Sequence, residues 1–367
     1  MSKLEIVRFA PRKGVSSFHD ALKRNVDAYF ENTGLSQNGD HRMVLKTVAM
    51  ISLYFVPYAV LISGWGNLYP VLFYGCWLLM GLGMVGIGTS VMHDSNHGAY
   101  TGKKNRDRML GLIIHFIGGN DIMWKIQHNI LHHTYTNIDG LDEDIDAGIL
   151  LRFSPHARRI GLHRYQHLYC WLLYGIMTLH WCTAKDFLGV IGYNKKGLLR
   201  KQRITLGQAL VEVVASKSVY FALFLILPLA ASGAGWGSVV IGFLLMHFVA
   251  GLSLASIFQL AHVMGESEFA APSEDGKMEN SWAVHQLVNT VNFAPNNKIL
   301  SWFIGGLNFQ IEHHLFPQIC HVHYPKLSAI VQRTAEEHGL KYQVRPTFRN
   351  ALREHGRMVR ELGHAAA

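Results

Sequence analysis

The chain has 367 residues, of which 49% are hydrophobic and only 16% carry a charge. Lys, Arg, Asp and Glu are absent from residues 47–92 and 218–265, and each of these stretches is long enough for two membrane spans of roughly 20 residues. This distribution excludes an ordinary water-soluble protein. The four cysteines form no C-x-x-C pair, so the sequence indicates buried free thiols rather than a zinc ribbon or a redox dithiol.

The formal net charge is +9, and its distribution predicts the topology. All Lys and Arg residues fall in 1–46, 103–217 and 277–367, and none lies in the short connectors at 65–68 and 233–236. By the positive-inside rule, the N-terminus, the middle segment and the C-terminus are expected to be cytoplasmic. The basic face can attract anionic lipid headgroups, an acidic electron donor or a phosphorylated acyl carrier, and we expect no nucleic acid partner.

Residues 1–43 are expected to form a cytoplasmic amphipathic segment, with a helix over 17–32 that Ser17 caps and Gly34 ends. A main domain over 44–340 follows, and 341–367 is expected to form a C-terminal cytoplasmic helix and tail. Apolar runs at 108–126 and 165–182 are interpreted as interfacial helices. Four membrane spans are predicted at about 45–63, 69–92, 216–232 and 238–264.

The predicted fold is therefore an all-α integral membrane protein. Four transmembrane helices form two hairpins, and glycines such as Gly81 and Gly83 allow close helix packing in the first one. Interfacial helices and a cytoplasmic helical cap are expected to hold a histidine-rich site for two metal ions.

Three histidine patterns carry the chemistry. The pair His93 and His97 has little weight alone, because 22 histidines produce any H-x-x-x-H pair about 1.3 times by chance. His163 and His167 have the same spacing and are treated as a decoy. The H-x-x-x-H-H pattern at 128–133 is expected about 0.08 times by chance, and the Q-x-x-H-H pattern at 310–314 about 0.04 times.

The spacing has a physical meaning on a helix. Residues four apart lie on one face, about 5–6 Å between Cβ atoms, so His93 and His97 can reach one metal, as can His128 and His132. His133 is expected to point elsewhere and to reach a neighbouring metal, and the adjacent pair at 313 and 314 also diverges. Imidazole suits iron, zinc, copper and nickel, and the spacing does not choose among them.

Histidines that bind metals usually donate their second N–H to a carboxylate or a carbonyl. Carboxylates near the three patterns are candidates for this role: Asp94, Asp142, Asp144, Asp146 and Glu312. The acidic run at 142–146 lacks the spacing of an EF-hand loop, so a calcium site is not indicated.

The three patterns resemble the histidine boxes of membrane fatty acid desaturases, and the third resembles that of the front-end group, which includes Δ6- and Δ5-type acyl desaturases and sphingolipid long-chain-base desaturases. The resemblance implies a four-span fold, a cytoplasmic-facing di-iron centre, an acyl chain in a buried tunnel, and desaturation by O₂ and two electrons. It implies that His262 is a further ligand beside the box histidines His93, His97, His128, His132, His133, His313 and His314. Gln310 stands where acyl-CoA Δ9 desaturases have a histidine, and it can bind metal, hold a water or orient a neighbour.

Many front-end relatives carry a fused cytochrome b5 domain with a His-Pro-Gly-Gly motif, which this sequence lacks. We therefore expect electrons from a separate donor, ferredoxin or cytochrome b5. A basic run is interpreted mainly as a membrane-surface loop, with docking of the donor or of an acyl carrier as the alternative; it comprises Lys195, Lys196, Arg200, Lys201 and Arg203.

Alternative functions remain open at this point. A lipid hydroxylase, an alkane monooxygenase or a sphingolipid long-chain-base desaturase would use the same chemistry. A histidine-rich divalent metal transporter would place ligands in mid-membrane, where only His247 lies, and we interpret His247 as structural. His285 is equally compatible with a site-adjacent and a structural role. The acyl carrier is CoA, acyl carrier protein or a glycerolipid.

Overall fold

The computed structural model describes residues 7–10, 17–265 and 267–365. The chain divides into two compact units, each assembled from segments that are far apart in the sequence. The first unit comprises Met1–Gly39, Gln127–Cys170 and Ser256–Ala367, and the second comprises Asp40–Ile126 and Trp171–Ala255. The described residues are mainly helical, as the sequence predicts.

Four continuous helices are long and apolar enough to cross a membrane: His41–Ile62, Pro70–His97, Leu206–Ala231 and Trp236–His262. The first is α2 and the last is α13. The second joins α3 (Pro70–Gly86), a π-helical segment (Ile87–Met92) and α4 (His93–His97), and the third joins α11 (Leu206–Phe221), a π-helical segment (Ala222–Ile226) and α12 (Leu227–Ala231). These helices confirm the prediction of four spans.

The third of these helices begins earlier than the predicted span at about 216. Thr205 and Gln208 form a capping box, which satisfies the free backbone N–H groups at the start of the helix. The later predicted start follows from the charge-free stretch, which begins only at residue 218. Lys217 is nevertheless buried, where its ammonium group pairs with Asp186 and donates to the carbonyl oxygen of Gly118 at 2.6 Å.

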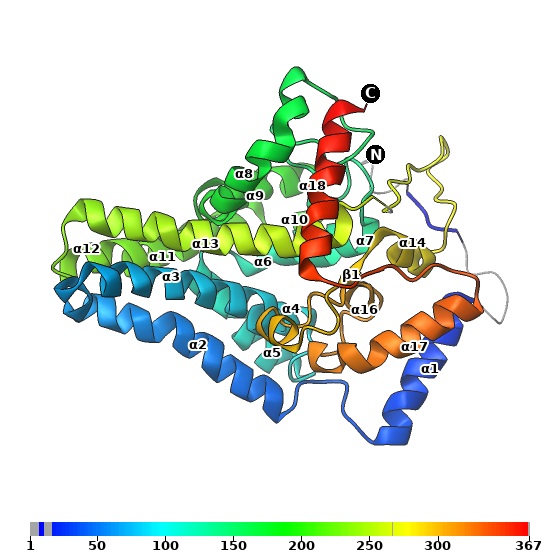
Figure 1. Ribbon diagram of the computed structural model, residues 1–367, viewed down its shortest axis with the longest axis horizontal. Helices are drawn as coiled ribbons and strands as arrows, with labels where there is room; N and C mark the ends of the chain where they lie inside the picture. Colours follow the sequence, from blue (N-terminus) through cyan, green and yellow to red (C-terminus); the bar gives the residue numbers. More distant parts are fainter. Residues whose placement is uncertain (1–6, 11–16, 266, 366–367) are drawn as a thin grey trace. The chain divides into compact units, whose positions relative to one another are not determined.

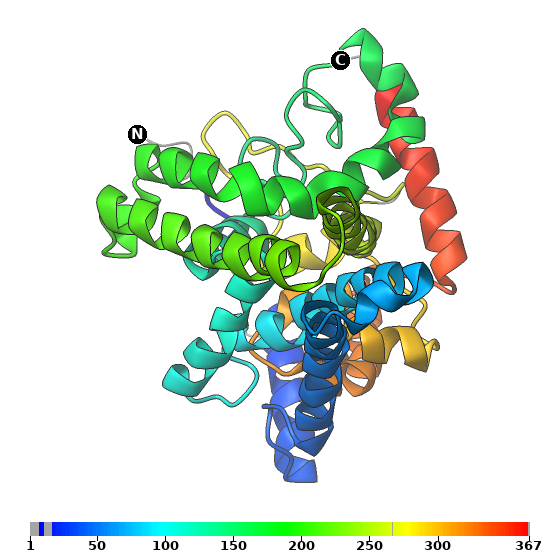
Figure 2. The same ribbon diagram turned by 90° about the vertical axis from the view of Figure 1, so that its left-hand side faces the viewer.

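Helices α2 and α3 of the second unit pack side by side (Figure 1 and Figure 2). The contact is close because α3 places glycine against the neighbouring backbone. A Cβ atom at Gly83 would lie 2.8 Å from Cα of Tyr54 in α2, and one at Gly81 would lie 2.7 Å from the carbonyl oxygen of Met246 in α13. The predicted role of glycine in helix packing is confirmed at these positions.

The candidate spans leave large apolar side chains exposed. Such an outward surface would be unfavourable in water and is typical of helices that face lipid. The side chains concerned include Val48, Val56, Val71, Leu72, Val219, Ile226, Ile241 and Leu244.

Shorter helices complete the second unit. They are α5 (Lys104–Gly111), a 3-10 segment (Leu112–Ile117), α6 (Asp121–Trp124), α8 (Gln166–His180), a π-helical segment (Trp181–Lys185), α9 (Asp186–Lys195) and α10 (Leu198–Lys201). A 3-10 turn at Trp65–Leu68 joins α2 to α3. His247 of α13 has partners within this unit, with Nε2 2.9 Å from the Tyr220 hydroxyl and Nδ1 3.1 Å from the Thr178 hydroxyl, which fits a structural role.

The first unit has its own hydrophobic core. Helix α1 (Phe18–Thr33) packs against α14 (Trp282–Asn289) and α17 (Tyr324–Glu337), and Figure 1 shows α1 beside one end of α17. Ser17 caps α1 and Gly34 ends it with a φ of 65°, as predicted. The core residues include Leu22, Val26, Leu287, Ile311, Leu315, Leu327 and Val331.

The remaining elements of the first unit are short, apart from α18 (Phe348–His364). They are α7 (His133–Tyr135), 3-10 turns at Gly161–Tyr165 and His321–His323, α15 (Lys298–Phe303), α16 (Gln310–Leu315), β1 (Asn292–Phe293) and β2 (Val344–Arg345). The two strands pair in parallel, with Asn292 opposite Val344. Arg152 is fully buried and donates to the Leu362 carbonyl at 2.6 Å, so it satisfies the C-terminal end of α18.

Candidate metal centre

The second histidine pattern lies on a π-helical segment, Lys125–His132, which continues into α7. In a π-helix, backbone hydrogen bonds join residues five apart rather than four. The residues that face each other are therefore His128 and His133, whose Nε2 atoms are 3.2 Å apart. The expectation that His133 points away from His128 rested on α-helical spacing, and the π-helical turn alters it.

His132 joins a different set of histidines. It comes from the same turn, His262 ends α13, and His314 lies on α16. Each ring can offer one nitrogen, and the three nitrogens lie within 4.8 Å of one another. All three side chains are buried, and all belong to the first unit.

Hydrogen bonds at Nδ1 orient each ring of this set. His132 Nδ1 lies 3.1 Å from both carboxylate oxygens of Asp142, and His314 Nδ1 lies 2.8 Å from Oε1 of Gln286. His262 Nδ1 lies 3.3 Å from the Asn289 carbonyl oxygen. Since these oxygens can only accept, each Nδ1 carries a proton, and Nε2 is the atom of each ring that is left to bind a metal.

Asp142 is held firmly in this arrangement. It is fully buried and accepts from the backbone N–H of Asn137 at 2.9 Å and that of Asp144 at 2.9 Å. Asn137 has a φ of 59°, a left-handed conformation that asparagine tolerates. Its side-chain amide donates to the carbonyl oxygen of His262 at 2.9 Å, which ties the loop after the second pattern to the end of α13.

These charges change the protonation of His132. Burial lowers the pKa of His132, but Asp142 and then Asp144 outweigh burial and raise the pKa to about 9. A metal cation would compete with that proton, so metal binding at His132 would release a proton near neutral pH.

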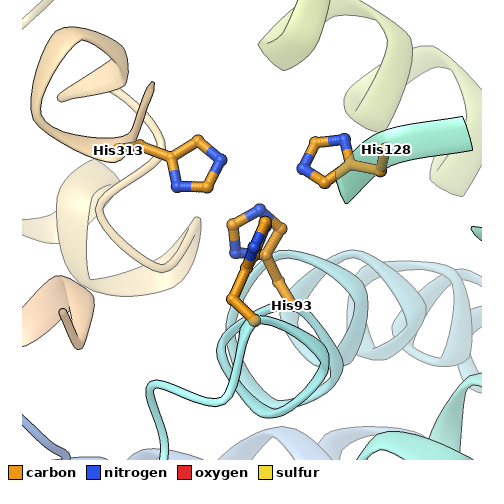
Figure 3. Close-up of side chains that lie close together, drawn as sticks. His93, His128 and His313 are labelled. Carbon is orange, nitrogen blue, oxygen red and sulfur yellow. The ribbon is translucent and has the colours of Figure 1, made fainter. Parts of the chain in front are cut away.

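A second set in the first unit consists of His128, His133 and His313. The ring centroid of His133 lies 4.7 Å from that of His128 and 4.6 Å from that of His313. Figure 3 shows the rings of His128 and His313 turned toward the same space; they are nearly parallel, with centroids 5.8 Å apart. His313 Nδ1 also lies 3.3 Å from the Tyr324 hydroxyl.

Glu312 precedes the two adjacent histidines in α16 and anchors this helix through hydrogen bonds. It accepts from the side-chain amide of Asn292 at 2.7 Å and from the Tyr342 hydroxyl at 2.7 Å. Burial raises the pKa of Glu312 to about 7 despite these hydrogen bonds. Asn292 also accepts from the backbone N–H of Ile311 at 2.9 Å, so the short sheet fixes the start of α16.

The first histidine pattern belongs to the second unit. His93 and His97 lie on α4, one turn apart, with ring centroids 4.7 Å apart. Trp124 packs edge-on against both rings, with its ring centroid 5.8 Å from that of His93 and 5.6 Å from that of His97. Nδ1 of His93 lies 3.5 Å from the Asp94 carboxylate.

The other predicted residues divide between the cluster and its surroundings. Asp144 lies 3.4 Å from His132 Nδ1 and accepts from Gln127 at 2.5 Å. Asp146 is exposed and accepts from the backbone N–H of Gly148 in its own loop.

Gln310 is buried and donates to the Leu307 carbonyl at 2.8 Å. His285 lies beside the cluster, with Nε2 2.7 Å from the Thr136 carbonyl oxygen. The basic run at 195–203 follows α9 in the second unit and is largely exposed.

Two residues that hold the ligands were not identified from the sequence. Gln286 accepts from His314 and from the Thr136 hydroxyl, both at 2.8 Å, and Asn289 supplies the carbonyl for His262. The available signal was the position of Gln286 and Asn289 on one short amphipathic helix with His285. Nothing local connects that helix to histidines at 262 and 314.

The donor set fits a transition metal. Buried imidazoles with fixed tautomers and carboxylate or amide partners are typical of bound iron, zinc or copper. The separation of 3.2 Å between Nε2 of His128 and Nε2 of His133 also matches two nitrogens that each lie about 2.1 Å from one ion.

Comparison with known proteins identifies the family. A sequence model of the fatty acid desaturase family matches residues 67–346. This chain belongs to the fatty acid desaturase family. The sn-1 linoleoyl-lipid 6-desaturase of Synechocystis sp. is 35% identical over 369 residues, which cover 100% of both chains. The protein of the same name from Arthrospira platensis is 36% identical, over 91% of this chain and 89% of the relative.

An acyl-lipid (8-3)-desaturase of Physcomitrium patens is 32% identical, over 94% of this desaturase and 72% of the relative. The family and the relatives confirm that the protein is an enzyme, an oxidoreductase that introduces double bonds into fatty acyl chains. They do not favour a lipid hydroxylase, an alkane monooxygenase, a long-chain-base desaturase or a metal transporter. The four candidate spans agree with a membrane desaturase.

Proposed function

We propose that this enzyme is an acyl-lipid front-end desaturase that introduces a double bond at carbon 6 of a linoleoyl chain carried by a membrane glycerolipid. Two relatives named sn-1 linoleoyl-lipid 6-desaturases support this substrate, one of them over the full length of both chains. Relatives named for 5- and (8-3)-desaturation share lower sequence identity with this chain, and they also support a desaturase of the front-end group.

The geometric observation that carries the reaction type is the buried set of His132, His262 and His314. We propose that this set binds one iron ion. We propose that His128, His133 and His313, whose rings lie next to one another, bind a second. His93 and His97 are proposed as further ligands, because their spacing matches the first box of the family. Two bound iron ions would supply the activation of O₂ that removes hydrogen from two adjacent methylenes.

The protein's own residues would position the reactants. The Nδ1 partners keep the ligand rings in one orientation, and the buried site excludes water from the reaction. One turnover would convert a CH₂–CH₂ pair and O₂ to a CH=CH bond and two waters. That balance requires two electrons and two protons, and we propose that the electrons come one at a time from a separate donor protein, ferredoxin or cytochrome b5.

We further propose that the N- and C-termini are cytoplasmic. The distribution of Lys and Arg supports this, since the connectors between the paired spans carry neither. The metal centre would then face the compartment that holds soluble electron carriers.

Expression in a host that makes linoleoyl lipids but lacks 6-desaturation would test the proposal. Gas chromatography and mass spectrometry of the glycerolipid fraction should reveal a linoleoyl chain with an added double bond at carbon 6. The variant His132→Ala should make no product, and the decoy variant His163→Gln should retain it.

Three results would contradict the proposal. A hydroxylated product would indicate a different oxidation, and a double bond elsewhere would overturn the assigned position. Desaturation by His132→Ala with its full iron content would rule out the proposed ligand set.

A further inference from the structure

Helix α18 presents a stripe of arginines to solvent. The stripe comprises Arg349, Arg353, Arg357 and Arg360, and all four side chains are exposed. Their spacing of four, four and three residues keeps them within an arc of roughly 80° along about 16 Å of the helix. Four aligned guanidinium groups therefore form one continuous basic surface.

The stripe is unpaired within the described part of the chain. Two acidic residues share the helix. Glu354 pairs with Arg345, and Glu361, four residues after Arg357, is exposed and forms no ion pair with the stripe among the described residues. Arg159, also exposed, donates to the carbonyl oxygen of Gly363 at 2.9 Å and extends the positive charge beyond the last turn. Self-repulsion among these charges is unfavourable for folding alone, so the stripe is better explained by an acidic partner than by the fold.

The opposite face of α18 is buried and leads to the metal centre. Its residues are Ala351, His355, Val359 and Leu362. His355 is fully buried, and its Nδ1 donates to the carbonyl oxygen of Val263 at 2.9 Å. Val263 is bonded directly to His262, so one helix separates the arginine stripe from a histidine of the proposed metal set.

We propose that the arginine stripe of α18 is the docking surface for an acidic, soluble one-electron carrier protein. The proposal rests on the proposed function, which requires an outside supply of electrons. In each turnover two reduced carrier molecules would dock in succession, and each would lose one electron. The two electrons and two protons, with the two hydrogens taken from the acyl chain, reduce O₂ to two waters.

The physical requirements of electron delivery favour this surface. Electron transfer slows steeply with distance, and His355 offers a short packed route from α18 to the end of α13. Electron-transfer complexes are small and short-lived, and they depend on charge steering more than on buried apolar area. A row of arginines with little exposed apolar surface between them matches that kind of encounter.

The test uses the full-length enzyme in nanodiscs of phosphatidylcholine, a lipid without net charge. The probe is a plant-type [2Fe–2S] ferredoxin kept reduced by NADPH and its reductase. Changing all four arginines of the stripe to glutamine should raise the KM for ferredoxin about tenfold or more at low salt. The salt dependence of kcat/KM should flatten, and kcat at saturating ferredoxin should change less than twofold.

A matched variant controls for the loss of four positive charges. Lys23, Arg24, Lys326 and Arg333 are exposed on α1 and α17 of the same unit, and changing them to glutamine should leave the KM for ferredoxin unchanged. A second arm changes the basic run at 195–203 to glutamine. The proposal is overturned if that arm, rather than the stripe, raises the KM.

Two further measurements separate the remaining outcomes. Enzyme reduced fully in advance and then mixed with O₂ should give one turnover in both the wild type and the stripe variant. If the wild type gives no product in that experiment, the proposed function fails. If the stripe variant keeps the wild-type KM but loses binding to phosphatidylglycerol vesicles, the stripe contacts the membrane and the docking proposal is wrong.

Discussion

At the scale of single residues, the site depends on which nitrogen of each histidine carries the proton. Asp142, Gln286 and the Asn289 carbonyl each accept from an Nδ1 atom, and this leaves Nε2 available to a metal. Such partners usually matter nearly as much as the ligands, because they fix both the tautomer and the orientation of the ring. Their loss should therefore weaken metal binding before it disturbs the fold.

Asp142→Asn should reduce the affinity for iron about 10- to 100-fold, because the neutral amide no longer stabilises the ring of His132. Competition with a chromophoric chelator would measure the affinity. Asp146→Asn makes the same change at an exposed position in the same loop, and it should bind iron like the wild type. Equal affinities in the two variants would show that the carboxylate of Asp142 has no role in metal binding.

Gln286→Leu removes the acceptor for both His314 Nδ1 and the Thr136 hydroxyl. Leaving buried donors without acceptors costs about 1–3 kcal/mol each, so we expect a lower unfolding temperature and a reduced iron content in the purified protein. Gln286→Glu keeps an acceptor oxygen and should restore much of the iron content. Normal iron content in the leucine variant would argue against an orienting role for Gln286.

At the scale of elements, the hairpin of α2 and α3 depends on a close approach of two backbones. A Cβ atom at Gly83 would lie 2.8 Å from backbone atoms of Tyr54, whereas a Cβ atom at Gly75 of the same helix would meet nothing within 4 Å. The two glycines thus have different roles that sequence alone does not separate.

Gly83→Ala should destabilise the protein by about 1–3 kcal/mol, because the helices must separate to admit the methyl group. Gly75→Ala should be neutral or slightly stabilising, since alanine favours a helix more than glycine does. Thermal unfolding in detergent would compare the two variants with the wild type. A stable Gly83→Ala variant would contradict the close packing of α2 and α3.

The attachment of α18 should depend on pH through His355. Burial lowers the pKa of His355 to about 4, despite its hydrogen bond to Val263, from an ordinary value of 6.5. The unfolded chain therefore binds the proton more readily than the folded chain. This contribution to stability is fully present above about pH 6.5 and is lost as the pH falls toward 4.

The loss should amount to about 3 kcal/mol from this one group, at about 1.4 kcal/mol for each pH unit. Unfolding temperatures between pH 7.5 and pH 5 would show a smaller decline in His355→Gln than in the wild type. His364→Gln changes an exposed histidine of the same helix and should keep the wild-type profile. An unchanged decline in His355→Gln would mean that other groups set the pH dependence.

At the scale of the whole molecule, the proposed metal centre ties together segments that are far apart in the sequence. His132, His262 and His314 come from three elements of the first unit. A ligand that binds only the folded state stabilises that state, so bound iron should hold these elements together.

Removal of iron with a chelator should lower the unfolding temperature of the detergent-solubilised protein, and added ferrous iron should restore it. His262→Ala should reduce this difference, because one ligand of the proposed set is missing. The His163→Gln variant serves as a control and should show the full effect. An identical unfolding temperature with and without iron would contradict a metal centre that spans these elements.

Much of the fold could be predicted because its determinants are local. Charge-free apolar runs indicate four spans, and a capping residue such as Ser17 marks the start of a helix. The prediction of where the third membrane helix starts was less accurate, because a buried partner for Lys217 is a tertiary feature that the surrounding sequence does not reveal.

The site was predicted less completely than the fold. The histidine patterns are rare enough to select candidate ligands, and the resemblance to desaturases added His262 to them. Which histidines act together could not be predicted, because the spacing was interpreted as α-helical. The π-helical turn brings His133 to His128 and frees His132 to join His262 and His314.

By itself the sequence determined the class of protein, the number of candidate spans and the residues able to bind metal, since these follow from composition and short-range spacing. Only the tertiary structure decided the grouping of the histidines and the partners that orient them. The physical reason is that backbone hydrogen bonding within a turn and contacts such as that of Gln286 with His314 depend on packing between distant segments. No short stretch of sequence contains that information.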